Sequence, residues 1–340
     1  MTGGSLKTAI RLIVAVAVSG GCLYFATRGT DWAGVEAVLR GASPGWSLGV
    51  ILVSLGCHVL RAERWRVLLR PVGDVPRGPA ITSTFIGFGA NSVLPLRVGE
   101  IVRPVLLARR VRIGVPATIS SIVLERLFDG LLVVCCFLAV GVLYDVDPHL
   151  RTVAIVFGGG ALLTFAVLML MARHRERSEA LVRRLLSPLP ARARDVIWSI
   201  AEGLLHGLGG LADGRSIALV LVYSIVLWSA ITLTYTLSFL ALDIHVPLVV
   251  ASLTTVVVVG AFVMLPQAPG FIGTWQLGCT TALGLFHVPA DVAVGYSLLT
   301  WVIQMIVNVG SAAVSLALQD VSVRQLAQDV EKAEQEAVHG

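Results

Sequence analysis

The 104 residues from 216 to 319 carry only two formal charges, Asp243 and Asp291. Over all 340 residues, 14% are charged and 56% are apolar, whereas an ordinary soluble domain has roughly a quarter charged residues. So few charges cannot cover the surface of a soluble protein of this size. The composition therefore excludes a soluble enzyme, a disordered protein and a nucleic-acid-binding module, and it predicts an all-α polytopic membrane protein.

Long apolar runs follow one another along the chain, separated by polar or charged segments. Because about 20 apolar helical residues cross a bilayer, we expect about 7–8 transmembrane helices. They are expected to form a single transmembrane domain over residues 1–320, with pseudo-repeat halves at about 10–145 and 150–320. The apolar runs are 12–27, 41–60, 78–96, 115–144, 152–172, 216–242, 246–286 and 292–319.

Arginine placement predicts the orientation, because Arg-rich loops stay on the cytoplasmic side of a membrane. Residues 61–112 contain ten Arg and only three acidic residues, and Lys7 and Arg11 lie near the N-terminus. We therefore expect an integral plasma (inner) membrane protein whose N- and C-termini are cytoplasmic. The charged segment 173–215, with an amphipathic surface helix at 178–186, and a polar tail at 321–340 are placed on the same side.

Two apolar runs do not fit simple membrane crossings. Residues 78–96 connect two Arg-rich segments that both belong in the cytoplasm, so this run is expected to enter the membrane, turn and leave on the side it entered. Residues 246–286 are too long for one crossing and are expected to enter from outside and return there. The two breaks share one pattern, Leu94-Pro95-x-x-x-Gly99 and Leu265-Pro266-x-x-x-Gly270, 171 residues apart.

Re-entrant segments that enter from opposite sides are typical of inverted repeats, and in transporters such broken helices mark a substrate site near the midplane. Proline cannot continue a helical hydrogen-bond ladder, and glycine permits a tight turn. We therefore expect re-entrant hinges at Pro95, Gly99, Pro266, Pro269, Gly270, Gly273 and Gln276.

Charged and polar residues in three groups are candidates for substrate binding. The first group, Arg61 and Arg64 next to Trp65, either binds lipid phosphate through its guanidinium forks or simply caps the end of a span in the cytoplasm. The second group surrounds the first break, where a helix restarting at Gly99 would point N–H groups at an anion. Its members are Asn91, Arg97, Glu100 and Arg103.

The third group is Glu125, Arg126 and Asp129, inside the run 115–144. Glu125 lies about ten residues into this run, or roughly 15 Å at 1.5 Å per helical residue. Glu125 and Asp129 share a helix face at i,i+4, and Arg126 can pair with Asp129 at i,i+3. Charges at this depth cost about 2.5–3.5 kcal/mol each, so the group is either an ion-pair staple between helices or a polar cavity for an anion.

No catalytic or metal-binding signature accompanies these groups. The motifs GxSxG, P-loop, HExxH and a strand-linked GxGxxG are absent. The five cysteines lie in apolar stretches without a CxxC pair, and His58 and His287, at span ends, are expected to be interfacial. We expect no cofactor, no metal, no nucleic-acid partner and no enzymatic activity.

Together these motifs resemble the transmembrane region of lysylphosphatidylglycerol synthases, a family of flippase-like integral membrane proteins. The resemblance covers about residues 10–320, with two departures: Phe271 stands where the family often has a second glycine, and Gln276 where it often has an acidic residue. It rests on Arg61-x-x-Arg64-Trp65 with Leu68-Leu69, on Asn91-x-x-Leu-Pro95-x-Arg97-x-Gly99-Glu100-x-x-Arg103, on Glu125-Arg126-x-x-Asp129 and on Pro266-x-x-Pro269-Gly270-x-x-Gly273.

The resemblance implies a lipid flippase that moves an anionic, aminoacylated or polyprenyl-phosphate-linked lipid between leaflets through an Arg/Glu-lined cavity. Because few residues follow the last apolar run, we expect a stand-alone member without the soluble aminoacyl transferase domain. Expected partners are membrane lipids, and also a second copy of the chain or an envelope enzyme. Two alternatives stay open: an accessory membrane subunit of a cell-envelope glycosyltransferase, and an intramembrane enzyme acting on a lipid phosphate with Glu125, Glu100 or Asp129 as general base.

Overall fold

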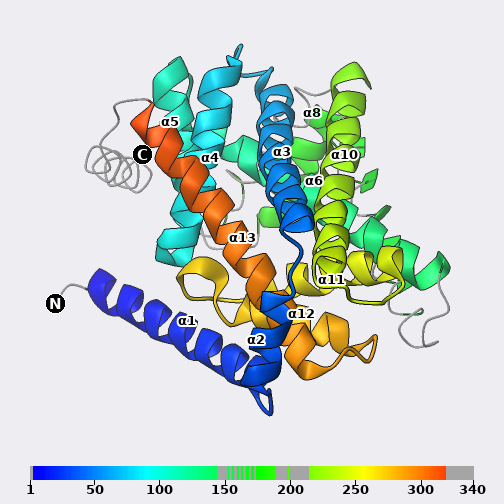
Figure 1. Ribbon diagram of the computed structural model, residues 1–340. Helices are drawn as coiled ribbons and strands as arrows, with labels where there is room; N and C mark the ends of the chain where they lie inside the picture. Colours follow the sequence, from blue (N-terminus) through cyan, green and yellow to red (C-terminus); the bar gives the residue numbers. More distant parts are fainter. Residues whose placement is uncertain are drawn as a thin grey trace. The chain divides into compact units, whose positions relative to one another are not determined.

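A computed structural model of the chain describes residues 3–143, 174–187 and 214–318, together with single positions between 152 and 198 (Figure 1). The regular elements within these ranges are all helices, which confirms the expected all-α class. The chain folds into two compact units, and it passes from one unit to the other several times along its length. Unit 1 is built from Met1–Val59, Thr84–Arg103 and Leu227–Gln328, and unit 2 from Leu60–Ser83, Pro104–Val226 and Asp329–Gly340.

Unit 1 contains both breaks that the sequence predicts. The helices α3, α4, α5 and α10 each pass from one unit into the other, so unit 1 holds only part of each. Its elements are α1 Gly3–Thr27, α2 Trp32–Arg40, the first part of α3 Pro44–Leu69, the last part of α4 Arg77–Val93, the 3-10 turn η1 Pro95–Arg97, the start of α5 Gly99–Val111, most of α10 Gly214–Ala241, α11 Leu248–Val263, the turn η2 Pro269–Phe271, α12 Thr274–Gly284 and α13 Ala290–Ala317.

Unit 2 contains the remaining parts of the shared helices together with α6 Val115–Leu143 and α8 Arg175–Leu186. The helix α8 covers the predicted amphipathic helix at 178–186, and its Leu181 and Leu185 side chains are exposed. Most of the residues 188–213, about half of the run 152–172 and the tail 321–340 lie outside the described residues.

The number of membrane crossings is only partly established. Among the described residues, α3, α10 and α13 are long and apolar enough to cross a membrane. Residues 13–27 of α1 and the following α2 are bent by 85° and would add a fourth crossing if they form one broken span. The expected total of seven to eight and the inverted repeat are therefore not confirmed, although both predicted breaks are present.

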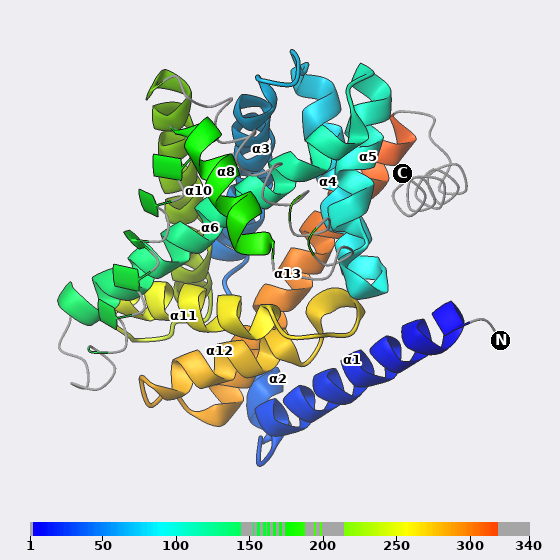
Figure 2. The same ribbon diagram turned by 180° about the vertical axis from the view of Figure 1, so that it is seen from behind.

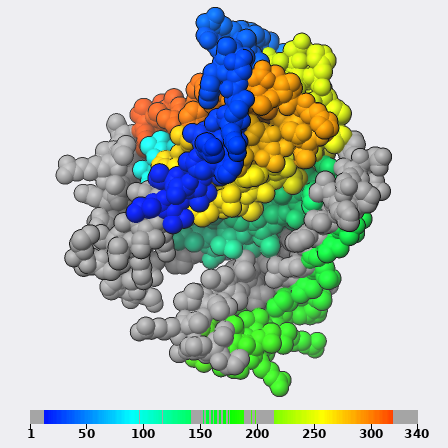
Figure 3. All heavy atoms as spheres, turned by 90° about the horizontal axis from the view of Figure 1, so that it is seen from below, coloured from blue at the N-terminus to red at the C-terminus, as the bar shows by residue number. Residues whose placement is uncertain are grey.

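Small residues allow the helices of unit 1 to pack closely. A Cβ atom at Gly278 of α12 would lie 3.0 Å from Val259 Cα of α11, and one at Gly295 of α13 would lie 2.9 Å from Val38 of α2. In lipid there is no hydrophobic force between helices, so close van der Waals contact between small residues holds them together. The helices α11, α12 and α1 lie side by side in the reverse view (Figure 2), and α1 crosses the surface of α12 (Figure 3).

Candidate functional site

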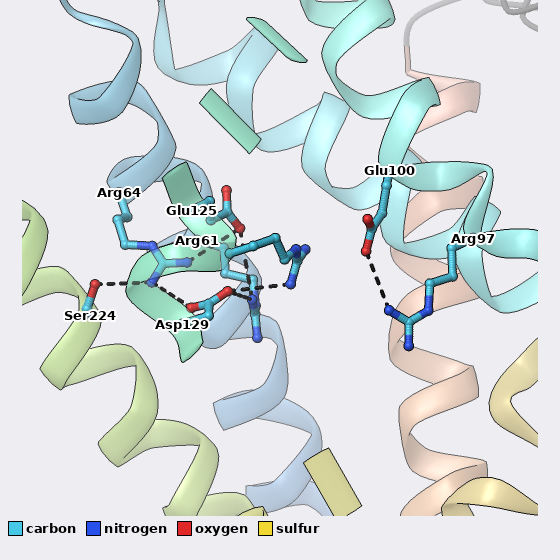
Figure 4. Close-up of polar contacts among 8 residues, drawn as sticks. Arg61, Arg64, Arg97, Glu100, Glu125, Asp129 and Ser224 are labelled. Carbon is cyan, nitrogen blue, oxygen red and sulfur yellow. Dashed lines mark hydrogen bonds and ion pairs between the residues drawn. The ribbon is translucent and has the colours of Figure 1, made fainter. Parts of the chain in front are cut away.

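A buried charge cluster in unit 2 joins α3, α6 and α10 (Figure 4). Arg64 of α3 donates through Nη1 to Asp129 Oδ1 at 2.8 Å and to Ser224 Oγ at 3.1 Å. Its Nη2 lies 3.4 Å from Glu125 Oε1. The side chains of Arg64 and Glu125 have no exposed surface. This guanidinium therefore acts as an internal cross-link between three helices.

The edge of the same cluster is more open. Arg61 Nη1 lies 3.5 Å from Asp129 Oδ2 and 4.0 Å from Glu125 Oε1, and Arg126 Nη1 lies 3.4 Å from Asp129 Oδ2. The Arg126 side chain is 43% exposed. Three guanidinium groups and two carboxylates give the cluster a formal charge of +1, and Arg126 is its most exposed cation.

The local sequence explains how the cluster forms. Arg61 and Arg64 are three residues apart on α3, and Glu125 and Asp129 are four apart on α6, so each pair projects from one helix face. Beside the cluster, Trp65 Nε1 donates to Ser121 Oγ at 2.8 Å and ties α3 to α6 a second time. The interpretation of this segment as an exposed charge cap with an interfacial Trp is wrong, because Arg64 and Trp65 are both fully buried.

The first helix break lies in unit 1, where the sequence predicts it. The helix α4 ends at Val93, Leu94 is extended, and α5 begins at Gly99. Gly99 is required by a close approach: a Cβ atom there would overlap the carbonyl oxygen of Gly87 and lie 2.6 Å from Asn91 Oδ1. The predicted break at Pro95 and Gly99 is present, and Asn91 lies against the start of α5; the role of this break as a re-entrant hinge stays a prediction.

Arg103 is placed differently from the other candidates at this break. Its side chain is buried, and its Cβ would be only 2.7 Å from a Cβ atom added at Gly87. Arg103 thus packs inside the hairpin formed by α4 and α5.

The second break is held by its own side chains. Gly270 and Gly273 have φ angles of 73° and 84°, a region that favours glycine. Gln276 Oε1 accepts a hydrogen bond from the Gly273 backbone N–H at 2.7 Å, so Gln276 caps the N-terminus of α12. The neutral amide at the position where the family often has an acid therefore has a local structural task.

Residues between the two halves of the second break also hold it closed. Thr274 donates to Gln267 Oε1 at 2.6 Å, and Gln267 Nε2 donates to the Val263 carbonyl at 2.8 Å. From outside the break, Ser19 Oγ of α1 accepts from the Ala268 backbone N–H at 2.7 Å. The predicted break at Pro266 and Pro269 is confirmed as an ordered turn with hydrogen bonds on both sides.

The two breaks meet within unit 1, where η1 contacts η2. Arg97 of η1 donates through Nη2 to the carbonyl oxygen of Val263, the last residue of α11. On its other side, Arg97 Nη1 lies 4.0 Å from Glu100 Oε1, and the two side chains point toward each other (Figure 4). Both are about one third exposed, at 36% for Arg97 and 33% for Glu100.

A polar stripe on α13 contacts both breaks. Trp301 Nε1 donates to the Gly270 carbonyl at 2.7 Å, and Asn308 Nδ2 donates to Ser92 Oγ at 2.9 Å. Asn308 Oδ1 in turn lies 2.8 Å from His58 Nε2 and from Gln304 Nε2. The sequence interpretation missed this stripe, although polar residues in an otherwise apolar helix were the signal.

His58 also corrects one expectation. It is buried between Asn308 and the rings of Phe85 and Phe88, because α3 continues to Leu69 and places His58 near its middle. The other expected interfacial histidine, His287, is exposed in the loop between α12 and α13.

The candidate residues thus divide between the units. Asn91, Arg97, Glu100 and Arg103 belong to unit 1, whereas Arg61, Arg64, Glu125, Arg126 and Asp129 belong to unit 2. Their convergence on a single cavity stays a prediction. Within the described ranges, no three His, Cys, Asp or Glu side chains are arranged to hold a metal ion.

Comparison with known proteins adds a family. Over 275 residues the chain is 25% identical to a protein named glycosyltransferase AglD from Haloferax volcanii, covering 72% of this chain and 44% of that protein. The chain therefore spans less than half the length of this relative. No solved structure matches the chain. The family described as lysylphosphatidylglycerol synthase TM region matches residues 12–312, and the chain is an integral membrane protein belonging to that family.

Proposed function

We propose that this protein moves an anionic, aminoacylated or polyprenyl-phosphate-linked lipid between membrane leaflets without changing it chemically. The observation that carries the proposal is the meeting of two helix breaks at Arg97, a partly exposed cation in an apolar unit. The family supports a role in the membrane chemistry of lipids or the cell envelope.

Broken backbone is costly in a membrane, where it is tolerated only inside protein or along a water-filled cavity. Both breaks here are ordered and contact each other, so this free-energy cost arises twice in the same part of unit 1. In transporters, such breaks bind the substrate near the midplane. This supports a translocation site between η1 and η2.

Arg97 is the residue to which we assign the lipid headgroup. A guanidinium presents several N–H donors in a planar fork that matches phosphate oxygens. Arg97 is one third exposed, and its contact with Glu100 is loose at 4.0 Å. A headgroup phosphate can therefore approach it while the acyl chains stay in lipid, and Glu100 keeps the site from carrying an uncompensated charge.

The buried cluster in unit 2 receives a different role. Arg64 and Glu125 are fully buried and form an ion pair, and Arg64 also donates to Asp129 and to Ser224. A headgroup could reach them only after these contacts separate. We assign Arg64, Glu125 and Asp129 to the stability of unit 2, and only Arg61 and Arg126 at the open edge keep access to an anion.

A second candidate is a membrane subunit that works with a glycosyltransferase. The similarity to a protein named as a glycosyltransferase, of which this chain covers 44%, favours it. Under this alternative the breaks hold the lipid for an enzyme partner. A stable complex with a soluble transferase would then be isolated from native membranes.

Reconstitution separates these functions. The purified chain is placed in liposomes containing fluorescent phosphatidylglycerol, and a membrane-impermeant quencher measures the fraction of lipid in the outer leaflet over time. The proposal expects faster exchange between leaflets than in empty liposomes, with the lipid mass unchanged. Exchange no faster than in empty liposomes would contradict it, and a changed lipid mass would indicate an intramembrane enzyme.

A further inference from the structure

We infer that the Arg97 guanidinium exchanges between two acceptors, the backbone carbonyl of Val263 and the phosphate of a lipid headgroup, so that lipid binding releases one helix break from the other. This inference rests on the proposed function and concerns how the same site is controlled. Arg97 then has two tasks. It binds the lipid headgroup, and it acts as a tether between the two breaks until the headgroup displaces the Val263 carbonyl.

The carbonyl that Arg97 now binds resembles an anion electrostatically. Val263 is the last residue of α11, and the C-terminal end of a helix carries a partial negative charge on its final carbonyls. Arg97 reaches this carbonyl from the other break. In the present state, the end of α11 therefore takes the place that a phosphate oxygen would occupy on the guanidinium.

Release of Arg97 leaves no orphaned acceptor. The Val263 carbonyl also accepts a hydrogen bond from Gln267 Nε2 at 2.8 Å, and Gln267 is itself held by Thr274 at 2.6 Å. A buried carbonyl that loses its only donor incurs a desolvation penalty. Because Gln267 stays in place, that penalty is avoided, and the exchange is inexpensive.

A phosphate competes well for the released guanidinium. A phosphate offers a full charge and can accept two parallel N–H bonds, whereas a carbonyl offers a partial charge. The Arg97 side chain is 36% exposed, so such a ligand can approach its guanidinium. Arg64 shows the contrast, since its guanidinium has no exposed surface, donates through Nη1 to Asp129 and Ser224, and lies 3.4 Å from Glu125.

The exchange couples the ligand to the fold. The contact from Arg97 to Val263 joins η1 to the end of α11, so its loss removes a side-chain bond between the two broken helices. The stripe on α13 still holds Ser92 and Gly270. We therefore expect the ends of α4 and α11 to move apart locally while the unit stays folded.

Spin-label distance measurements test this exchange. Labels are attached to cysteines placed at Val93 and Met264, which are exposed at 59% and 71% and flank the two breaks. Cys135 and Cys136 are replaced by alanine, and the buried Cys22, Cys57 and Cys279 are retained. The full chain is measured in maltoside detergent alone, with dihexanoylphosphatidylglycerol, and with inorganic phosphate.

In the native chain, we expect the short-chain lipid to shift the label distances to a longer, broader distribution and inorganic phosphate to leave them unchanged. Arg97→Gln should show the longer distribution without lipid and no further change with it. Arg97→Lys, which keeps the charge but not the fork, should respond only at higher lipid concentration. Arg112→Gln is the matched control, since Arg97 and Arg112 both have a φ of 55°, and Arg112 is exposed at the end of α5.

Identical distributions in the native chain and Arg97→Gln, or no response of the native chain to the lipid, would overturn the exchange. A response to inorganic phosphate alone would contradict a lipid headgroup as the competing ligand. The result is separable from transport: a chain that exchanges lipid between leaflets but shows no distance change refutes only the tether. A chain that shows the distance change but moves no lipid refutes only translocation.

Discussion

The buried cluster around Arg64 and the paired breaks around Arg97 use the same residue types in opposite ways. In the cluster, Arg64 and Asp129 are 2.8 Å apart and almost without exposed surface. At the breaks, Arg97 and Glu100 are 4.0 Å apart and about one third exposed. A short, buried ion pair stabilises the fold, whereas a longer, partly exposed ion pair allows a ligand to approach the charged group.

The two regions also differ in the space around a glycine of the backbone. At the first break, Gly99 touches Gly87 so closely that no Cβ atom fits between the two segments. Next to the cluster, Gly130 follows Asp129 directly, and a Cβ atom there would meet nothing within 4 Å. A side chain is therefore excluded at Gly99 of the first break, whereas there is room for one at Gly130 beside the cluster.

The largest expected effect comes from removing the central charge of the cluster. Arg64→Met leaves Glu125 and Asp129 buried with fewer partners, and breaking a buried pair in this way costs about 3–5 kcal/mol. We expect a sharp fall in monodisperse protein and in unfolding temperature. Arg40→Met is the matched control, because Arg40 pairs with Glu36 on an exposed surface, where such a pair contributes about 1 kcal/mol or less.

Similar stability of the two arginine variants would show that the cluster is not a structural staple. Its burial would then serve another purpose, and the comparison with the breaks would fail.

The second largest effect tests the close backbone contact at the first break. Gly99→Ala forces a methyl group against the Gly87 carbonyl, a backbone atom that cannot rotate away. Overpacking of this kind costs about 1–3 kcal/mol, so we expect a lower unfolding temperature in detergent. Gly130→Ala, in the open position beside the cluster, should leave it unchanged or slightly raised, because alanine favours the helix. Equal effects at both glycines would contradict the tight contact at the break.

A smaller effect compares one hydrogen bond in each region. Ser224→Ala removes a bond accepted from the charged Arg64, and Ser92→Ala removes one accepted from the neutral Asn308. Bonds to charged groups contribute about 1.5–3 kcal/mol and neutral ones about 0.5–1.5 kcal/mol. Thermal unfolding of the two variants should therefore show the larger loss for Ser224→Ala, and the reverse order would indicate that the cluster is hydrated.

Sequence reasoning located the breaks well, since proline and glycine act on the backbone at the positions where they occur. Pro95, Gly99, Pro266 and Gly270 all lie in or beside the turns of the structure. It also paired Arg126 with Asp129, because a helix brings residues three apart together. Local rules of this kind need no knowledge of the tertiary fold.

Contacts between distant segments could not be predicted in the same way. Ser224 lies 160 residues from Arg64, and Val263 lies 166 residues from Arg97. Ser224 is an ordinary polar residue in an apolar helix, and the acceptor in Val263 is a backbone atom, so neither carries a sequence signal. Whether an arginine stabilises the fold or can bind a ligand depends on these distant partners, which only the structure shows.

The central claim is that the partly exposed arginine at the breaks serves transport rather than folding. Its most direct test is the rate of phosphatidylglycerol exchange between leaflets by Arg97→Gln in liposomes, normalised to folded protein, with the unfolding temperature measured on the same preparation. We predict a rate at least about tenfold lower, equivalent to about 1.4 kcal/mol of barrier, at an unfolding temperature close to that of the native chain. A folded Arg97→Gln variant that moves lipid at the native rate, or a loss of rate that only follows a loss of folded protein, would contradict the claim.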